Sequence, residues 1–348
     1  MPDRDSTLIN VKEYYGKTLK SSHDLKTSAC CSPDGLPKHL KDILRQLEPE
    51  IVERFYGCGS PIPQALEGCT VLDLGCGTGR DVFMIARLVG ESGRVIGVDM
   101  TEEQLSVARR NADAQMQRFG LPRANVEFQL GYIEDLAALG IEPDSIDVVV
   151  SNCVINLSPE KRRVFSEIFR VLKPGGELYF SDIFADRRIP KELANDAVLR
   201  GECLGGALYI EDFRRLLREI GILDYRVTAS NPIELDDAQV KAVAGMIDFR
   251  SLTVRAFKLD LEDICEDYGQ VATYKGGIPH APHEFVLDDH HTFAAGKPLL
   301  VCGNTAAMVQ ETRYGRYFQV LGDRSTHFGA FDCSHASDRP RDIGESCC

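Results

Sequence analysis

Residues Thr70-Val-Leu-Asp-Leu-Gly-Cys-Gly-Thr-Gly79 decide the fold, because they join a short apolar run to a glycine-rich turn. Asp73 lies in the run, and Gly75, Gly77 and Gly79 follow before a helical stretch at 81–88. Glycine has no Cβ, so a turn of this composition lets a ligand approach the backbone and the start of the next helix closely. The stretch therefore predicts a strand, a ligand-binding turn and a helix.

Short apolar runs alternate with helical stretches after this turn. We expect further strands at 94–99, 126–130, 146–150, 176–181, 224–228 and 249–257. We expect helices at 101–119, 161–172, 211–220 and 236–245. This alternation is typical of a parallel sheet with helices on both faces. The fold class is therefore α/β, with a seven-stranded, mostly parallel sheet.

The remaining segments do not follow this alternation of strands and helices. Residues 1–37 read as an irregular arm with a short helix around 11–15, and 38–55 as an amphipathic region that Pro49 divides into two helices. Residues 182–210 interrupt the alternation as an insertion. We expect four parts: an N-terminal part at 1–68, the sheet domain at 69–260, a small α+β domain at 261–330 and a mobile tail at 331–348.

Composition narrows the class of function. The 348 residues carry a formal net charge of −13 and twelve cysteines. The acidic balance, without basic blocks, argues against nucleic acid or an anionic membrane as partner. The charged first residues are followed by no apolar signal region, and no apolar run reaches the ~18–20 residues of a membrane span. We expect a cytoplasmic protein with a small-molecule substrate, in which unusual cysteine usage indicates metal binding or redox chemistry.

A second acidic residue sharpens the reading of the turn. Asp99 ends the next expected strand, where a carboxylate can accept hydrogen bonds from both ribose hydroxyls of a nucleoside. Arg80 stands where the dinucleotide fingerprint has glycine or alanine. The turn resembles motif I of the class I S-adenosylmethionine methyltransferases; the alternative is a plain Rossmann-like turn that binds no nucleoside.

That resemblance implies S-adenosylmethionine as cofactor and assigns roles by position. The glycines would line its methionine and ribose portion, Asp99 would hold the ribose, and Met100 would pack on adenine. Ile133 and Glu134 would contact the adenine edge, and Asn152 would face the methionine. The implied cofactor-binding residues are Asp73, Gly75, Gly77, Gly79, Asp99, Met100, Ile133, Glu134 and Asn152.

Four cysteines lie in segments that flank this cofactor site. Cys153 follows the fourth strand directly, and Cys203 lies in the insertion, at the usual place for a lid over that end of the sheet. Cys30 and Cys58 precede the sheet. A single buried cysteine is usually a small hydrophobic residue. Several that converge on one site would form a cage of soft thiolates.

Several motifs together give a more specific resemblance. They are Tyr14-Tyr-Gly16, Leu25-Lys-Thr-Ser-Ala-Cys30, Tyr56-Gly-Cys-Gly59, Gly131-Tyr-Ile-Glu134, Ser151-Asn-Cys-Val-Ile-Asn-Leu157, Gly176-Glu-Leu-Tyr-Phe-Ser-Asp182 and Gly201-Glu-Cys-Leu-Gly-Gly-Ala-Leu-Tyr209. In this order they resemble the arsenite S-adenosylmethionine methyltransferases. The resemblance covers roughly residues 10–330, and the sequences around Cys153 and Cys203 are its most diagnostic part.

The resemblance implies that the chain is an enzyme that methylates arsenite to mono- and dimethylarsenicals in arsenic detoxification. Cys58, Cys153 and Cys203 would hold arsenic(III), the substrate, and the arsenic lone pair would attack the sulfonium methyl. A disulfide between Cys30 and Cys58 would return oxidised product to the trivalent state, with thioredoxin or glutathione as reductant. No metal cofactor and no oligomer is expected.

Two other functions remain open at this stage. A class I methyltransferase with an organic acceptor would turn over without metalloid. A thiolate protein that only sequesters or senses metalloid would bind arsenite without the cofactor.

The other cysteines and the histidines have plainer readings. Cys76 reads as packing in the turn, and the single cysteines are expected to be structural: Cys69, Cys265, Cys302 and Cys333. Cys347 and Cys348 form either a solvated tail pair or an accessory metalloid site. Four histidines suggest zinc weakly, because no cysteine is spaced to complete a site: His280, His283, His290 and His291.

Overall fold

The structure is a computed structural model that describes Lys12 and residues 36–55, 57, 59–194, 196, 199, 203–235 and 238–332. Cys30, Cys58, Cys333, Cys347 and Cys348 lie outside these residues, as does the predicted helix around 11–15 apart from Lys12. The predictions made for them therefore stay untested. Within the described ranges, no helix combines the length and apolar character needed to cross a bilayer.

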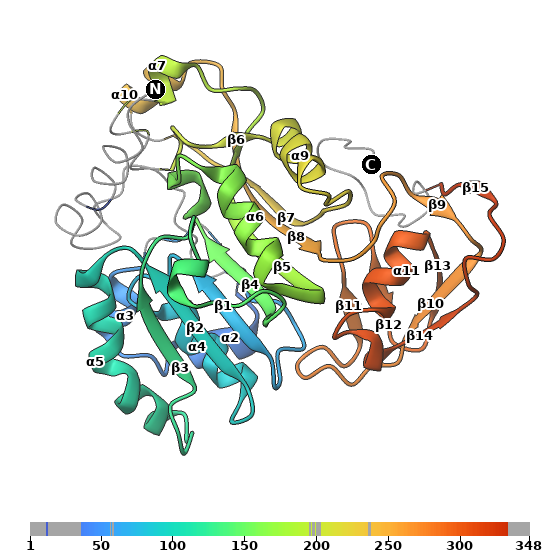
Figure 1. The fold of residues 1–348 in the computed structure, drawn as a ribbon, viewed down its shortest axis with the longest axis horizontal. Coiled ribbons are helices and arrows are strands. Elements are labelled where there is room, and N and C mark those ends of the chain that lie inside the picture. The colour runs from blue at the N-terminus through green and yellow to red at the C-terminus, as the bar shows by residue number, and fades with distance from the viewer. Residues whose placement is uncertain are drawn as a thin grey trace.

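A central sheet organises the first two thirds of the chain (Figure 1). Its order is β3-β2-β1-β4-β5-β8-β7, and the short β6 pairs with the end of β5. The strands are β1 (Thr70–Leu74), β2 (Arg94–Asp99), β3 (Val126–Leu130), β4 (Ile146–Asn152), β5 (Leu172–Ala185), β6 (Leu208–Tyr209), β7 (Arg226–Pro232) and β8 (Phe249–Phe257).

The pairing directions match the expected mostly parallel sheet. The neighbours from β3 to β5 run parallel, whereas β8 runs antiparallel to both β5 and β7. The α/β class and the seven-strand path are confirmed, and β6 is an addition that the sequence did not indicate. Strand order reverses between β1 and β4, so a crevice opens outside their carboxyl ends.

Helices cover both faces of the sheet. The helices of one face are α2 (Lys38–Leu44), α3 (Pro49–Glu53), α4 (Arg80–Val89) and α5 (Glu102–Arg118). The helices of the other face are α6 (Lys161–Val171) and α9 (Ile210–Glu219). Val71 packs into the first core and Leu72 into the second, because successive strand side chains point to opposite faces. Pro49 opens α3, which confirms the predicted division of this region.

The boundaries of three strands differ from expectation, and the first of them, β4, continues to Asn152 rather than ending at 150. β5 begins at Leu172, directly after α6, rather than at Gly176, and the pairing of β4 with β5 shifts register between Ile146 and Val148. This irregularity lies where β5 contains the Lys173-Pro-Gly-Gly stretch. β7 extends to Pro232 because the antiparallel β8 continues beside it.

Two short helices lie beyond the carboxyl ends of the central strands. α7 (Lys191–Ala194) belongs to the insertion, and α10 (Ala238–Ala244) lies between β7 and β8. Figure 1 shows both at the top of the molecule, next to β6. Val240 and Ala244 of α10 share a small core with Leu199, Cys153 and Cys203.

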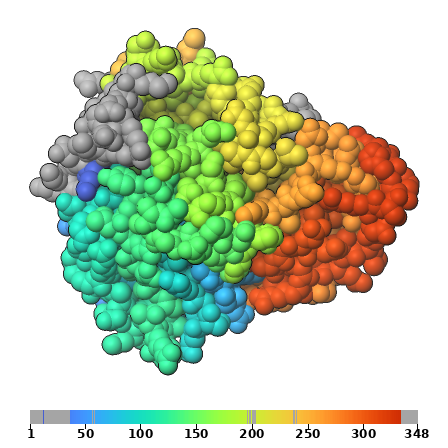
Figure 2. All heavy atoms as spheres, in the orientation of Figure 1, coloured from blue at the N-terminus to red at the C-terminus, as the bar shows by residue number. Residues whose placement is uncertain are grey.

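The C-terminal part, residues 261–332, forms a separate lobe with its own core (Figures 1 and 2). Its strands are β9 (Glu266–Asp267), β10 (Gln270–Tyr274), β11 (Glu284–Val286), β12 (Thr292–Ala294), β13 (Pro298–Val301), β14 (Phe318–Leu321) and β15 (Gly329–Ala330). They pair in three small sheets, and α11 (Gly303–Gln310) packs on β10 and β14. Short apolar runs at 271–274, 285–287 and 298–302 predict three of these strands. No pattern predicts α11, whose residues lack an apolar stripe because nearly the whole helix is buried.

A buried ion-pair network joins this lobe to the central sheet. Glu177 of β5 is fully buried and pairs with Arg255 of β8 at 2.8 Å and with Arg313 at 2.5 Å. Tyr314 donates its hydroxyl hydrogen to the same carboxylate at 3.0 Å. The positive groups of two segments thus compensate one buried charge of the sheet.

Candidate active site

A cavity lies at the carboxyl ends of β1, β2 and β4, where the strand order reverses. Its walls come from the glycine-rich turn, the loops after β2, β3 and β4, and the segment before β1. The predicted cofactor residues in its wall are Asp73, Gly75, Gly77, Asp99, Met100, Ile133, Glu134 and Asn152. Gly79 is the one member of that set that is not part of the wall.

The three glycines of the turn have different structural roles. All three have positive φ, at 73° for Gly75, 53° for Gly77 and 86° for Gly79. A Cβ on Gly77 would meet nothing within 4 Å, so this residue faces open space. A Cβ on Gly79 would lie 3.0 Å from the rings of Phe83 and Phe128. Gly77 therefore leaves room for a ligand, whereas Gly79 allows the start of α4 to pack on the sheet.

Asp99 is held in place by the backbone around it. Its carboxylate accepts the N–H of Gly77 at 2.9 Å and that of Thr101 at 2.8 Å. Burial raises the pKa of Asp99, and these backbone donors oppose the rise. The side chain is thereby fixed at the end of β2 before any ligand binds.

Buried carboxylates gather at the cavity. Burial, together with Asp81 and Asp99, raises the pKa of Asp73 well above its usual value. Arg80 bonds to Asp81 at 2.9 Å and stacks 3.4 Å from the ring centroid of Phe55. A cation placed among these carboxylates would relieve their mutual repulsion. These carboxylates thus fit a ligand that has a positive sulfonium sulfur and a ribose near Asp99.

Asn152 secures the segment before β1. Its side-chain oxygen accepts the Gly59 N–H at 3.1 Å, and its amide donates to the Gly59 carbonyl at 2.8 Å and to Asp81 at 2.9 Å. The sequence predicted a contact with the methionine part of the cofactor. Asn152 does lie in the cavity wall, but its polar atoms bind the segment that contains Cys58.

Glu134 is also engaged within the protein. The Ser158 hydroxyl donates to it at 2.5 Å, and both residues line the cavity. Ile133, beside Glu134, is buried in the core under the same wall. This hydrogen bond joins the loop after β3 to the turn after β4, a link that no local pattern in the sequence indicated.

Cys153 and Cys203 meet although fifty positions separate them. The Cys203 thiol donates to the Cys153 carbonyl oxygen at 3.3 Å, and each residue is 5% exposed. Both have positive φ, 57° and 62°, which costs a non-glycine residue energy and marks a position that the surrounding structure enforces. Cys203 does not line the cavity, whereas Cys153 does. Cys153 is disulfide-bonded in this state, and Cys203 carries a thiol.

A close backbone contact positions the insertion. A Cβ on Gly206 would lie 1.9 Å from the Asn156 carbonyl oxygen, so only glycine fits there. Asn156 follows Cys153 in the short η5 (Ile155–Leu157). The segment of Cys203 therefore lies directly on the turn of Cys153.

Asp182, which was not predicted as a site residue, binds the backbone of the turn that follows Cys153. Its carboxylate accepts the N–H of Asn156 at 3.0 Å and that of Ile183 at 2.9 Å. Burial raises the pKa of Asp182 to about 7. An acidic residue directly after the expected strand at 176–181 was the signal that could have found it.

The histidines expected as weak zinc candidates are engaged elsewhere. Nδ1 of His291 lies 2.8 Å from Asp288, and the ring of His280 stacks on His39 at 4.4 Å. In the described parts of the chain, no three His, Cys, Asp or Glu side chains gather as a metal site.

Comparisons with known proteins agree with this geometry. A family model described as a methyltransferase domain matches residues 65–221, and one described as the arsenite methyltransferase C-terminal domain matches residues 268–342. An arsenite methyltransferase of Aquipseudomonas alcaligenes is 55% identical over 93% of this chain and 93% of its own length. The human arsenite methyltransferase is 41% identical over 89% of this chain and 83% of its own.

The chain belongs to the arsenite methyltransferase family. A solved structure supports this: CrArsM, an arsenic(III) S-adenosylmethionine methyltransferase from Chlamydomonas reinhardtii, has 50% identity and a TM-score of 0.83. The match covers 86% of this chain and all of CrArsM. Membership of the arsenite methyltransferase family confirms the expected fold, an enzyme that transfers a methyl group, and S-adenosylmethionine as its cofactor.

Proposed function

We propose that this chain methylates arsenic(III), with Cys58, Cys153 and Cys203 as the thiolates that hold the substrate. The observation that carries the proposal is the contact of Cys203 with Cys153, both buried and both with positive φ beside the cofactor cavity. Strained residues of this kind persist where the structure over-determines them, often at functional sites. The most similar relatives bear the name of this activity.

The hydrogen bonds between Asn152 and Gly59 support Cys58 as the third arsenic ligand. Gly59 bonds through both its N–H and its carbonyl to Asn152, the residue that precedes Cys153. Gly57, on the other side of Cys58, lines the cavity. The residues that flank Cys58 thus lie near Cys153, although Cys58 itself is outside the described residues.

The cavity residues would hold the cofactor in the roles expected from the motif. Asp99 would bind the ribose, Gly77 would allow close approach of the backbone, and the carboxylates of Asp73 and Asp81 would favour the positive sulfur. When bound, the cofactor supplies an electrophilic methyl group. The protein's own contribution is to place that group and the substrate in one geometry.

The thiolates would do chemical work without a general base. Three sulfur ligands displace the oxygens of arsenite, and they leave the arsenic lone pair free. This nucleophile has no proton to lose. Catalysis then depends on positioning, so the rigid backbone around Cys153 and Cys203 matters more than any titrating group of the cavity.

A reductant is part of the proposal. Because Cys153 is disulfide-bonded in this state, a thiol reductant must release it before it can bind arsenic. Thioredoxin or glutathione is the expected reductant, and a Cys30–Cys58 disulfide the expected oxidised form after turnover. We further propose that the enzyme acts as a cytoplasmic monomer in arsenic detoxification, with methylation up to the dimethyl form.

The test is arsenic speciation over time with purified protein, S-adenosylmethionine and a thiol reductant. Methylated arsenicals and S-adenosylhomocysteine should appear together, and only with arsenite present. Turnover without arsenite would favour an organic acceptor. Tight arsenite binding without binding of S-adenosylmethionine in calorimetry would indicate a sequestering protein.

A further inference from the structure

Two buried cysteines lie together in the C-terminal lobe, far from the cofactor cavity in sequence. Cys302 follows β13 and is the N-cap residue of α11, and Cys265 precedes β9. Cys302 is fully buried and Cys265 is 8% exposed. The sequence analysis expected both to be inert packing residues without a partner pattern.

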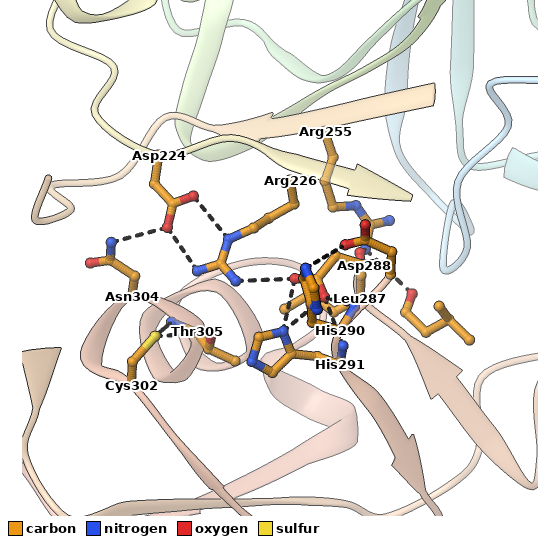
Figure 3. A network of polar contacts seen from close by, with 12 residues as sticks. Asp224, Arg226, Arg255, Leu287, Asp288, His290, His291, Cys302, Asn304 and Thr305 are labelled. Carbon is orange, nitrogen blue, oxygen red and sulfur yellow. Dashed lines mark hydrogen bonds and ion pairs between the residues drawn. The ribbon is translucent and has the colours of Figure 1, made fainter. Parts of the chain in front are cut away.

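The Cys302 sulfur makes several polar contacts. Its sulfur accepts the backbone N–H of Thr305 at 3.4 Å and lies 3.2 Å from the Thr305 hydroxyl oxygen (Figure 3). The side chain of Cys265 hydrogen-bonds to it as well. Cys302 thus makes polar contacts with the backbone and side chain of Thr305 and with Cys265, at the start of a helix, where a thiolate is favoured.

Arg226 of β7 supplies a positive charge to the same place. It bonds to Asp224 at 2.7 Å and to Asp288 at 3.1 Å (Figure 3). His291 lies against Asp288 at 2.8 Å, and the Asn304 amide donates to Asp224 at 3.0 Å. The charged network around Cys302 therefore joins the sheet domain to the C-terminal lobe.

The hydrogen bond from Cys265, followed by the charge of Arg226 and the bonds from Thr305, lowers the pKa of Cys302 to about 5, although burial opposes this. Burial raises the pKa of Cys69 and of Cys76. The surroundings of Cys302 therefore favour its thiolate form, whereas burial favours the thiol form of Cys69 and Cys76.

We propose that Cys265 and Cys302 form a reversible dithiol–disulfide site that hydrogen peroxide oxidises. The Cys302 thiolate attacks a peroxide oxygen, so that an S–O bond forms, the O–O bond breaks and the leaving hydroxide takes a proton to become water. The Cys265 sulfur then attacks the Cys302 sulfur, which forms the disulfide and releases a second water. One peroxide is reduced for each pair of thiols oxidised.

The burial of the pair favours a disulfide over a bound ion. The proposed intermediate adds one oxygen atom to the Cys302 sulfur and the disulfide retains none, whereas a bridging arsenical would keep an arsenic atom and its substituents beside a fully buried Cys302. Oxidation also removes a negative charge beside Arg226, at the junction of the two domains. The site is distinct from the cysteines proposed for substrate and turnover, and it does not depend on that proposal.

Tryptic peptide mapping tests the site in the full chain. The purified, reduced protein is treated with hydrogen peroxide, quenched with acid, and alkylated under denaturing conditions without reductant. Cys265 and Cys302 are the single cysteines of the tryptic peptides 259–275 and 276–313. We expect these two peptides to become linked, with the loss of two hydrogens, and to separate after treatment with dithiothreitol.

Variants supply the controls. Cys302→Ser should abolish the link and leave Cys265 alkylatable, whereas Cys265→Ser should leave a sulfenic acid at Cys302 that dimedone traps. Cys69→Ser, which removes another thiol that is 8% exposed, should link like the wild type. The proposal is wrong if both peptides stay alkylatable while other thiols oxidise, or if methylarsonous acid bridges them and peroxide does not.

Discussion

The Cys203 thiol donates a hydrogen bond to the carbonyl oxygen of Cys153 at 3.3 Å, which places the insertion directly on the turn after β4. The contact brings the insertion against Cys153, a residue of the cavity wall. It also makes the position of one proposed arsenic ligand depend on the backbone of the other.

Serine at Cys153 or Cys203 should lower the rate of arsenite-dependent S-adenosylhomocysteine formation by roughly 10²-fold or more. Two remaining ligands cannot hold arsenic in the reactive geometry. Calorimetry should show that S-adenosylmethionine still binds to the reduced variants. Cys69→Ser is the matched control and should keep normal activity. Full activity in either site variant would refute the assignment of the ligands.

Alanine at Gly206 should separate the insertion from the turn, because its Cβ would lie 1.9 Å from the Asn156 carbonyl oxygen. We expect a loss of arsenite affinity together with a destabilisation of about 1–3 kcal/mol. Gly140→Ala is the control: its φ is 71°, but the new Cβ meets nothing within 4 Å. That variant should lose about 1 kcal/mol and no affinity. Equal arsenite affinities in the two variants would contradict this prediction.

Alanine at Asn152 should release Gly59, because three hydrogen bonds of the side chain disappear. We expect kcat/KM for arsenite to fall by about 10–100-fold, since ligand positioning is lost. Asn125→Ala also removes two part-buried amide hydrogen bonds, to Ala86 and Gly90, but at a remote site. This control variant should have a lower thermal midpoint, and the kinetics of the folded enzyme should be unchanged. A similar fall of kcat/KM in both variants would contradict a positioning role of the Asn152–Gly59 hydrogen bonds.

The buried carboxyl of Asp182 should make stability depend on pH. Its pKa is about 7 in the folded protein, above its ordinary value of 3.8, so between these values the folded state keeps a proton that the unfolded state has lost. The free energy of unfolding therefore falls as the pH rises through this window, by at most about 4 kcal/mol.

Urea denaturation of wild type and Asp182→Asn at pH 5 and pH 8 measures this effect. The stability of the variant relative to the wild type should increase toward pH 8, whatever constant cost the amide adds. Parallel pH profiles would show that the carboxyl does not titrate in this range.

Glutamine at Glu177 should strongly destabilise the protein, by about 3–5 kcal/mol, because it leaves Arg255 and Arg313 buried without their common partner. Arg45→Ala is the control, since the Arg45–Asp42 pair is 73% and 48% exposed. Its loss should change the urea midpoint little, within about 0.5 kcal/mol. A similar small effect of both substitutions would show that the buried network does not join the domains.

The fold was largely readable from periodicity. The strand-and-helix alternation predicted the seven strands of the main path, and β8 was predicted with its observed bounds. β6 and α11 were missed because one consists of two residues and the other is buried on all sides, so neither leaves a periodic signal.

The candidate site was readable in part. The turn and Asp99 predicted a cofactor site where the structure has a cavity, because strand ends in a parallel sheet meet at one edge. The hydrogen bonds of Asn152 with Gly59 and of Glu134 with Ser158 were not predicted, because each joins residues far apart in the chain. The local sequence does not show which distant residue a polar side chain will bind in the folded protein.

The sequence by itself determined the fold class, the cofactor motif and the cysteines worth testing, since each follows from residue type and short-range spacing. Tertiary structure alone decided that Cys203 lies on Cys153, that Gly206 must be glycine, and that Cys302 has Cys265 and Arg226 as neighbours. These relationships depend on how distant segments pack, and packing sets both the reach of a thiol and the charge that it carries.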